Sequence, residues 1–410
     1  MKNYHQGELF EAVEQSYLEN NGQLTQQQLY ANVASQLNID PSEHIGSAGK
    51  QKNVNLFYRK VRWVQQSMKQ KKLLTQLERG IWTLSGTAKE RLHQINEAKS
   101  VIAMSTNLGI VICSTSQAVF DNDIIQEDID LVLTSPPYLL QKQRHYGGDY
   151  TVREWVDFVV EVISKILPRL ATGAAICLNI GQDSFVQGQP ARHTHIERLT
   201  IALEDDLKLS LVDRIVWQSN KAPGPYAWCS LNRQMLHTGY EFVLLFTNNP
   251  LALKANNQRV LLPHSKEYQN FVRNGGTKKP AINSDGAHRK SVGDYSKADL
   301  SKGKIATNNL YFSNKCTHNE KVNKYAREVL GCPTHGAKFP YKLVEFLVKY
   351  LCPEGGLVLD NMSGTGPVGE VCQANNRRFI CIEPILEYIK QSFIRYTSLT
   401  DEVWINPAFR

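Results

Sequence analysis

The sequence has no hydrophobic run long enough to cross a membrane. Although 42% of its 410 residues are hydrophobic, none of its segments approaches the ~18 consecutive apolar residues of a membrane span. The first residues, Met1-Lys2-Asn3-Tyr4-His5, lead into a polar amphipathic segment and not into the apolar core of a signal peptide. We therefore expect a soluble cytoplasmic protein, and its length predicts two or three domains.

The sequence also lacks the cysteine spacings that bind metal ions. It contains no Cys-x-x-Cys pair, and most of its eight cysteines lie in apolar runs. This pattern favours reduced structural thiols, with neither zinc nor disulfides. The cysteines stand at positions 113, 177, 229, 316, 332, 352, 372 and 381.

Lysine and arginine outnumber acidic residues in two regions, so the net charge of +8 is unevenly distributed. Residues 1–100 carry a net charge of +4 and residues 251–330 carry +9, whereas residues 101–250 carry −5 and residues 331–410 are neutral. Ordinary solvated surface could produce the total, but it explains the concentration less well. Two basic regions that bind a polyanion would explain it.

The first hundred residues predict three helices and a β-hairpin. Apolar residues at helical spacing indicate helices over 7–20, 25–37 and about 53–69. Two short strands are expected at 71–74 and 80–84, with a closing helix over 86–97. This order is typical of a winged-helix domain.

Positive charge gathers on the third predicted helix and the hairpin, where no acidic residue stands between Lys50 and Lys72. Phosphate contact and major-groove entry require such a surface, and we favour that interpretation over a solvated helix face. The residues expected to contact DNA are Lys52, Arg59, Lys60, Arg62, Lys69, Lys71 and Lys72. The region resembles the N-terminal winged-helix domain of Mrr-type restriction proteins, most closely in Arg79-Gly-Ile-Trp-Thr-Leu-Ser-Gly86.

A short apolar run at 129–133 predicts a buried strand that ends in Ser135-Pro136-Pro137-Tyr138. The two prolines cannot donate to a sheet ladder, so the strand stops there. Ligands of open α/β sheets bind at this carboxyl end of the strands. The ring of Tyr138 could stack on a flat polar group while Ser135 and the Pro136 carbonyl accept hydrogen bonds from an exocyclic amine.

Strands alternate with helices beyond a linker expected near 96–106. This alternation predicts a mostly parallel sheet covered by helices on both faces. The predicted strands are 108–113, 129–134, 174–180, 211–217 and 241–247, and the predicted helices are 119–125, 155–170 and 195–204. From Asn248 to about Pro333 the periodicity fades, and a stretch of this length indicates either function or disorder.

A second chemical motif follows a helix expected over 339–350. A strand ending at Asp360, a glycine loop over 361–366, a helix starting at Pro367 and a strand ending at Glu383 form the half-fold that holds a nucleoside. Glu383 is placed to accept two ribose hydroxyls. Glycines at 364, 366 and 369 also fit the spacing of NAD-binding loops, but nothing else indicates hydride transfer.

Together these motifs resemble the amino-group DNA methyltransferases of the permuted β class, over about residues 106–395. In that family the Ser/Asp-Pro-Pro-Tyr motif precedes the S-adenosylmethionine motif, as here. The resemblance implies a circularly permuted Rossmann-like α/β sheet and S-adenosyl-L-methionine as the cofactor. It implies catalytic roles for Ser135, Pro136, Pro137 and Tyr138, and cofactor contacts for Lys338, Phe339, Asp360, Ser363, Gly364, Thr365, Gly366 and Glu383.

The sequence departs from the family pattern at three places. Asn361-Met362 replaces the usual Pro-Phe, and Pro367 replaces a usual threonine, so one hydroxyl contact to the cofactor is in doubt. Ser114-Thr-Ser116 stands where many members carry an acid after the first strand.

The expected reaction is methyl transfer to the exocyclic amine of a base flipped out of double-stranded DNA. Within the family, serine before Pro-Pro-Tyr favours cytosine N4, and adenine N6 is the alternative. A transcription regulator with an inactive methyltransferase fold, or an RNA or protein methyltransferase, would explain the residues less well. A restriction-modification or defence context in a bacterial or archaeal cell, with a cognate restriction endonuclease, is expected.

We expect four segments. Residues 1–98 would form the winged helix, 106–250 the catalytic half, 251–331 a target-recognition region and 332–410 the cofactor-binding half.

Overall fold

The computed structural model describes most of the chain. The described residues are 9, 12–13, 15–17, 20, 23–48, 51–70, 74–78, 81–84, 100–139, 150–220, 226–277, 281–283, 288–290 and 293–409. The chain divides into two compact units, one of residues 1–92 with 331–333 and the other of residues 93–330 with 334–410. Among the described residues, no helix is long and apolar enough to cross a membrane.

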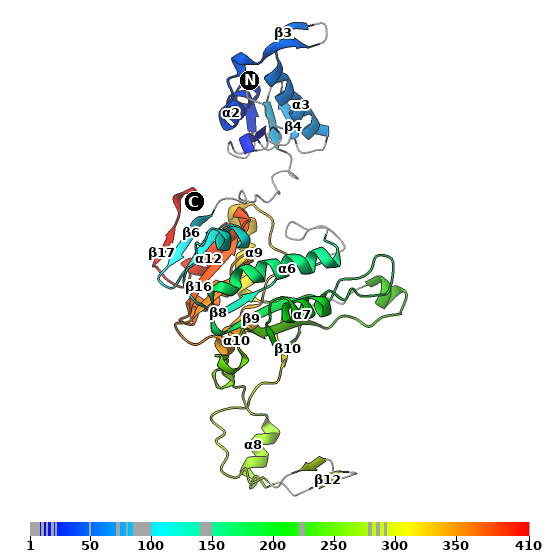
Figure 1. The fold of residues 1–410 in the computed structure, drawn as a ribbon, viewed down its shortest axis with the longest axis vertical. Helices are drawn as coiled ribbons and strands as arrows, with labels where there is room; N and C mark the ends of the chain where they lie inside the picture. The colour runs from blue at the N-terminus through cyan, green and yellow to red at the C-terminus, as the bar shows by residue number, and fades with distance from the viewer. Residues whose placement is uncertain are drawn as a thin grey trace. The chain divides into compact units, whose positions relative to one another are not determined.

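The N-terminal unit contains helices and a small antiparallel sheet (Figure 1). The strands β1 (Gln23–Thr25), β5 (Ile81–Leu84) and β4 (Leu74–Glu78) pair in that order beside helices α2 (Gln26–Leu37) and α3 (Leu56–Gln70). The capping box between Thr25 and Gln28 forms at the start of α2. Apolar residues of both helices, including Leu29, Val33, Phe57 and Val61, pack into one core.

A second hairpin was missed by the sequence prediction. Strands β2 (Ile45–Ala48) and β3 (Gln51–Asn55) pair between the two helices, so α3 starts three residues later than expected. The register of this hairpin shifts between Gly46 and Ala48, and Asn53 on the facing strand has a positive φ of 57°. Lys52, which precedes the expected third helix, lies on strand β3. The expected closing helix over 86–97 lies outside the described residues.

The second unit is built on a ten-stranded sheet. Its order is β14 (Asn309–Tyr311), β10 (Ser210–Gln218), β11 (Tyr240–Thr247), β9 (Leu170–Ile180), β8 (Ile129–Thr134), β15 (Leu357–Asp360), β16 (Arg378–Glu383), β7 (Gly109–Cys113), β6 (Val101–Thr106) and β17 (Val403–Ile405). The central strands from β9 to β7 are all parallel, and antiparallel pairs flank them. The expected α/β sheet is confirmed, with more antiparallel pairing at its flanks than the sequence predicted.

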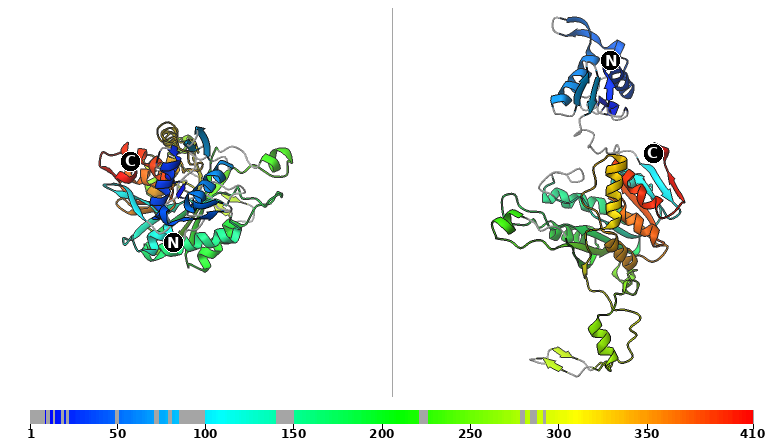
Figure 2. Two further views of the ribbon diagram at one scale, coloured as in Figure 1. Left: turned by 90° about the horizontal axis from the view of Figure 1, so that it is seen from above. Right: turned by 180° about the vertical axis from the view of Figure 1, so that it is seen from behind.

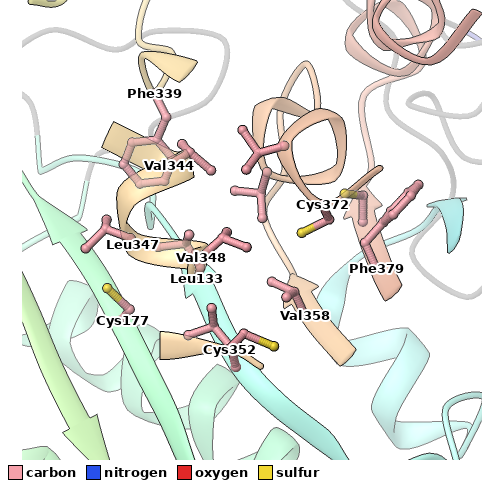
Figure 3. Close-up of a cluster of buried hydrophobic side chains, with 14 of the residues drawn as sticks. Leu133, Cys177, Phe339, Val344, Leu347, Val348, Cys352, Val358, Cys372 and Phe379 are labelled. Atoms are coloured by element: carbon pink, nitrogen blue, oxygen red, sulfur yellow. The ribbon is translucent and has the colours of Figure 1, made fainter. Parts of the chain in front are cut away.

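Helices cover both faces of this sheet (Figure 2). On one face lie α5 (Ser116–Asp121), α6 (Val152–Ile166) and α7 (His195–Asp205), which pack on side chains such as Val132 and Leu359. On the other face lie α10 (Tyr341–Leu351), α11 (Pro367–Ala374) and α12 (Leu386–Thr397). Figure 3 shows Val344, Leu347 and Val348 of α10 against Leu133 and Cys177 of the sheet. Successive side chains of a strand point to opposite faces of the sheet, so each central strand contributes to the hydrophobic core on both faces.

Two regions differ from the sequence prediction. Residues 101–106, expected to be part of a linker, form strand β6, which pairs with β7 on one side and with β17, the edge strand, on the other. The segment expected to be a target-recognition region contains α8 (Lys266–Arg273), β12 (Ala281–Asn283), β13 (His288–Lys290), β14 and α9 (Thr317–Tyr325). Its last part, 309–330, joins the central fold, since β14 pairs with β10 and α9 contributes to a buried polar network.

Candidate active site

A cavity of about 870 Å³ opens at the carboxyl ends of the central strands. Its volume lies within the range of about 300–1,000 Å³ typical of small-molecule sites. The loops after β8, β15 and β16 line it, together with segment 335–339 and two asparagines of α9. The two motifs that lie far apart in the sequence therefore meet around one space.

The Ser-Pro-Pro-Tyr segment is held in place from both sides. The Ser135 Oγ donates a hydrogen bond to the Asn179 carbonyl at 3.2 Å, and Trp155 Nε1 donates to the Pro137 carbonyl at 2.6 Å. Asn179 lies on the neighbouring strand β9, and Trp155 is buried on α6. A hydroxyl that donates its proton to a carbonyl keeps its lone pairs as acceptors. Ser135 can therefore accept a hydrogen bond from a ligand in the cavity.

Tyr138 forms a closed set of hydrogen bonds with Asn179 and Glu241. Its hydroxyl donates to Glu241 Oε2 at 2.9 Å and accepts from Asn179 Nδ2 at 2.8 Å, while Asn179 Nδ2 also lies 3.0 Å from Glu241 Oε2. Burial, followed by the Glu241 carboxylate, raises the pKa of Tyr138 well above its usual value. Sequence reasoning missed the roles of Asn179 and Glu241, because only the order of the strands brings them to Tyr138.

Asp360 joins the two motifs directly. Thr134 Oγ1, at the end of β8, donates to Asp360 Oδ1 at 2.9 Å, and Asp360 is only 3% exposed. Burial raises the pKa of Asp360 to about 7. This hydrogen bond fixes the Ser-Pro-Pro-Tyr segment relative to the glycine loop.

The Glu383 carboxylate lies in the cavity and orders the glycine loop. Its two oxygens accept hydrogen bonds from Gly364 N at 2.7 Å and Ile385 N at 3.0 Å. Burial raises the pKa of Glu383 to about 7 despite these donors. Each oxygen retains a second lone pair, so the carboxylate can still accept a ligand hydroxyl.

Glycine is required at two positions of the loop. Gly364 and Gly366 have positive φ angles of 51° and 72°. A Cβ on Gly364 would lie 3.3 Å from His335 Nε2, and one on Gly366 would lie 2.9 Å from the Tyr396 hydroxyl. Gly366 does not line the cavity, so its role in the structure is to let the loop pack on α12.

Segment 335–339 closes another side of the cavity. Lys338 Nζ donates to Asn323 Oδ1 at 2.6 Å, and burial followed by the charge of Arg395 lowers the pKa of Lys338 to about 7. The His335 ring packs edge-on against Tyr388 at 4.6 Å, and burial lowers its pKa to about 3. Phe339 is buried and also lines the cavity.

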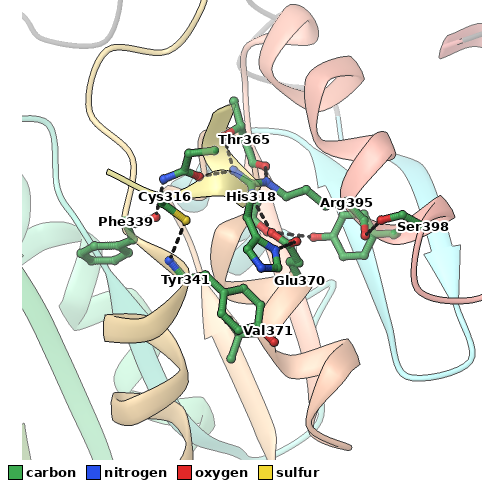
Figure 4. A network of polar contacts seen from close by, with 12 residues as sticks. Cys316, His318, Phe339, Tyr341, Thr365, Glu370, Val371, Arg395 and Ser398 are labelled. Atoms are coloured by element: carbon green, nitrogen blue, oxygen red, sulfur yellow. Dashed lines mark hydrogen bonds and ion pairs between the residues drawn. The ribbon is translucent and has the colours of Figure 1, made fainter. Parts of the chain in front are cut away.

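A buried polar network supports the loop from behind (Figure 4). Arg395 is ion-paired with Glu370, and it donates from Nε to the Thr365 carbonyl at 2.6 Å and from Nη2 to Asn319 Oδ1 at 2.7 Å. Asn319 Nδ2 in turn donates to the Phe339 carbonyl at 2.9 Å. The network thus ties α9, α11 and α12 to two walls of the cavity. No pattern in the sequence indicates it.

The structure brings most of the predicted site residues together. All of the residues predicted for catalysis and for cofactor contact line the cavity except Gly366. Of the residues predicted to contact DNA, Arg59, Lys60, Arg62 and Lys69 are exposed on α3, and Lys52 is exposed on β3. Lys71 and Lys72 lie outside the described residues.

Two protein-family models match the chain. The DNA methylase family matches residues 129–393, which is well over half of the chain, and the Mrr N-terminal domain matches residues 8–94. The type II methyltransferase M.PvuII of Proteus hauseri is 26% identical over 271 residues, 66% of this chain and 78% of the relative. The type II methyltransferase M.ScaI of Streptomyces caespitosus is 23% identical over 265 residues, which cover 64% of this chain and 73% of the relative.

A solved structure has the same fold. The structure described as PvuII DNA methyltransferase (cytosine-N4-specific) superposes with a TM-score of 0.54 at 22% identity, covering 71% of this chain and 87% of that chain.

Proposed function

This chain belongs to the DNA methylase family, and we propose that it transfers a methyl group from S-adenosyl-L-methionine to cytosine N4 in double-stranded DNA. That the chain is a DNA methyltransferase follows from the family match over residues 129–393. The proposal for its site depends above all on the hydrogen bond from Thr134 to Asp360, which joins the amine-binding segment to the glycine loop in one cavity.

The cavity residues fit the proposed cofactor. The Glu383 carboxylate faces the space with acceptor capacity for ribose hydroxyls, and the glycine loop precedes the start of α11, where a helix favours negative charge. Lys338 and Phe339 line the other side. When bound, S-adenosylmethionine supplies an electrophilic methyl group.

The Ser-Pro-Pro-Tyr segment would hold the amine that receives the methyl group. Ser135 Oγ donates its proton to the Asn179 carbonyl, so its lone pairs can accept one N–H of the amine of the base. The Pro136 carbonyl accepts the second N–H of the same amine. These two bonds localise the nitrogen lone pair on the amine. Tyr138 stacks on the flipped base, held by Asn179 and Glu241. Alignment of the amine then supplies much of the rate enhancement.

Two observations favour cytosine over adenine. Serine precedes Pro-Pro-Tyr in this sequence, and the structure with the same fold is described as cytosine-N4-specific. Adenine N6 is the second candidate. Sequencing of DNA methylated in vitro by the purified protein decides between them, because it reports the modified base and its surrounding sequence. N6-methyladenine as the product would reject the cytosine assignment.

We expect cofactor affinity to rise with pH through neutrality. Burial raises the pKa of Glu383 to about 7, so the ligand-free carboxyl is partly protonated there. Ribose hydroxyls donate to the charged form and lower its pKa, so binding releases a proton and strengthens as pH increases. Glu383→Gln should weaken binding by about 2–4 kcal/mol and flatten this pH dependence. Calorimetric titration at several pH values measures both effects, and unchanged affinity in a folded Glu383→Gln protein would reject the contact.

The N-terminal unit would add phosphate contacts, and segment 251–331 would read the sequence. Within that segment, 309–330 belongs to the central fold, so we assign recognition to about 262–304. The two ends of residues 262–304 lie side by side, because Leu262 and Lys304 exchange backbone hydrogen bonds of 2.8 and 2.7 Å. The remaining segments, 106–250 and 332–410, would be the catalytic and cofactor-binding halves. The protein would act in the cytoplasm beside a cognate restriction endonuclease.

Removing positive charge from α3 tests the first of these roles. Arg59→Ala with Arg62→Ala should weaken DNA binding uniformly and reduce the slope of log affinity against log salt by about 2, since each lost phosphate contact removes about one unit. The methylated sequence should stay the same. Gln66→Ala, an exposed uncharged position of the same helix, is the control. A changed recognition sequence would transfer sequence reading to α3.

A further inference from the structure

The segment between β10 and β11, residues 219–239, begins and ends at the candidate active site. Strands β10 and β9 both pair antiparallel to β11, and β9 is parallel to β8. The segment therefore leaves the sheet at the edge that carries the Ser-Pro-Pro-Tyr segment. Trp217 before it and Glu241 after it both line the cavity, and Glu241 accepts the hydrogen bond from Tyr138.

The described tip of this segment has an ordered fold. Ala227–Leu231 forms a single wide helical turn. The amides of Gln234 and Met235 donate to the Trp228 carbonyl at 2.8 and 3.2 Å, and Asn232 N donates to the Ala227 carbonyl at 2.9 Å. At its base, Arg192 donates to Thr238 Oγ1 at 2.7 Å and to the Gln182 carbonyl at 2.7 Å. The tip projects away from the sheet in both Figure 1 and Figure 2.

Large apolar side chains of the tip point into solvent. Tyr226 is 67% exposed, Leu231 is 62% exposed and Leu236 is 89% exposed. Single exposed apolar residues are common, but three within residues 226–236 of one projecting tip indicate a binding surface. The segment 219–239 also contains Lys221, Arg233 and His237 and no acidic residue, although residues 101–250 as a whole carry a net charge of −5. An apolar tip on an acid-free segment complements a polyanion with an apolar interior.

We propose that the tip, residues 226–236, enters the DNA double helix beside the target base pair and occupies the space that the flipped base leaves. This proposal rests on the proposed function, because it requires a base to leave the duplex for the cavity. Apolar side chains inserted between bases offset the loss of stacking when DNA is distorted. The start and end of the segment at the base-binding site, the exposed leucines and the absence of acids all fit this occupant better than a protein surface.

The test compares methyl transfer on two duplexes that contain the recognised sequence. One duplex is fully paired, and the other carries a mismatch at the target base, which lowers the cost of flipping. Leu231→Ala with Leu236→Ala should slow single-turnover methylation of the paired duplex by about tenfold or more, and the mismatched duplex should be methylated at nearly the wild-type rate. Both leucines are exposed, so the melting temperature should not change.

Leu251→Ala is the matched control. Leu251 is fully exposed, but it follows β11 at the opposite edge of the sheet, so both duplexes should react at the wild-type rate. A double variant equally slow on both duplexes, or as fast as wild type on the paired one, would overturn the proposal. A wild-type dimer that the double variant dissociates would assign the tip to a second copy of the chain and overturn it too. Failure of the wild-type protein to methylate either duplex would instead reject the proposed function.

Discussion

Tyr138→Ala is expected to slow single-turnover methyl transfer by about ten- to a hundredfold, because stacking of an aromatic ring on a base contributes about 1–3 kcal/mol. The side chain also closes the hydrogen-bond set with Asn179 and Glu241. In the proposed mechanism, its removal would leave the flipped base without a ring to stack on. Rapid-quench measurement with labelled S-adenosylmethionine gives the rate of this step.

Tyr138→Phe is the matched control for the ring. It keeps the stacking surface and loses only the hydroxyl, while Asn179 Nδ2 and Glu241 Oε2 remain 3.0 Å apart and can pair with each other. We expect a loss of less than about tenfold, since the ring remains and the pairing of Asn179 with Glu241 partly offsets the two hydrogen bonds that the hydroxyl makes. If a stably folded Tyr138→Ala protein reacted at a near-normal rate, or if both variants lost the same activity, the stacking role would be rejected.

Arg395→Ala is expected to lower the free energy of unfolding by about 3–5 kcal/mol, because it removes the guanidinium that pairs with the buried Glu370 carboxylate and leaves that carboxylate only its contact with His318. The side chains of Arg395 and Glu370 are 1% and 6% exposed. The variant also removes the donors to Thr365 and Asn319, so cofactor affinity should fall with stability. Urea unfolding measures the first effect and calorimetry the second.

Two further variants show whether charge burial causes this loss. Arg153→Ala removes a cation from an exposed pair with Asp157, and it should change stability by less than about 1 kcal/mol. Arg395→Met with Glu370→Leu removes both buried charges, so it should be more stable than Arg395→Ala alone. If the double variant were as unstable as the single one, the loss would come from the other contacts of Arg395.

The local structure around both motifs could be predicted from the sequence. Consecutive prolines follow β8, which ends at Thr134, and Pro367 starts α11 after a glycine loop. Both features could be predicted because each depends only on residues that are neighbours in the sequence. The continuous apolar runs of β8, β15 and β16 predict parallel strands covered on both faces, which the sheet confirms.

Contacts that depend on the order of strands could not be predicted. Glu241 reaches Tyr138 because β11 pairs with β9. The residues next to Glu241 and Tyr138 in the sequence do not indicate this contact. Strand β6 was missed, and one of its two partners, the edge strand β17, lies about 300 residues later in the chain. The Arg395 network likewise joins three helices whose positions only the fold determines.

Single-turnover transfer of a labelled methyl group from S-adenosylmethionine to a duplex, compared between wild type and Ser135→Ala, tests the central claim most directly. We predict labelled N4-methylcytosine after digestion of the wild-type product. We also predict a Ser135→Ala protein that binds cofactor and DNA normally and transfers the methyl group at a greatly reduced rate. A wild-type protein that labels no base, or a Ser135→Ala protein that transfers as fast as wild type, would contradict this mechanism.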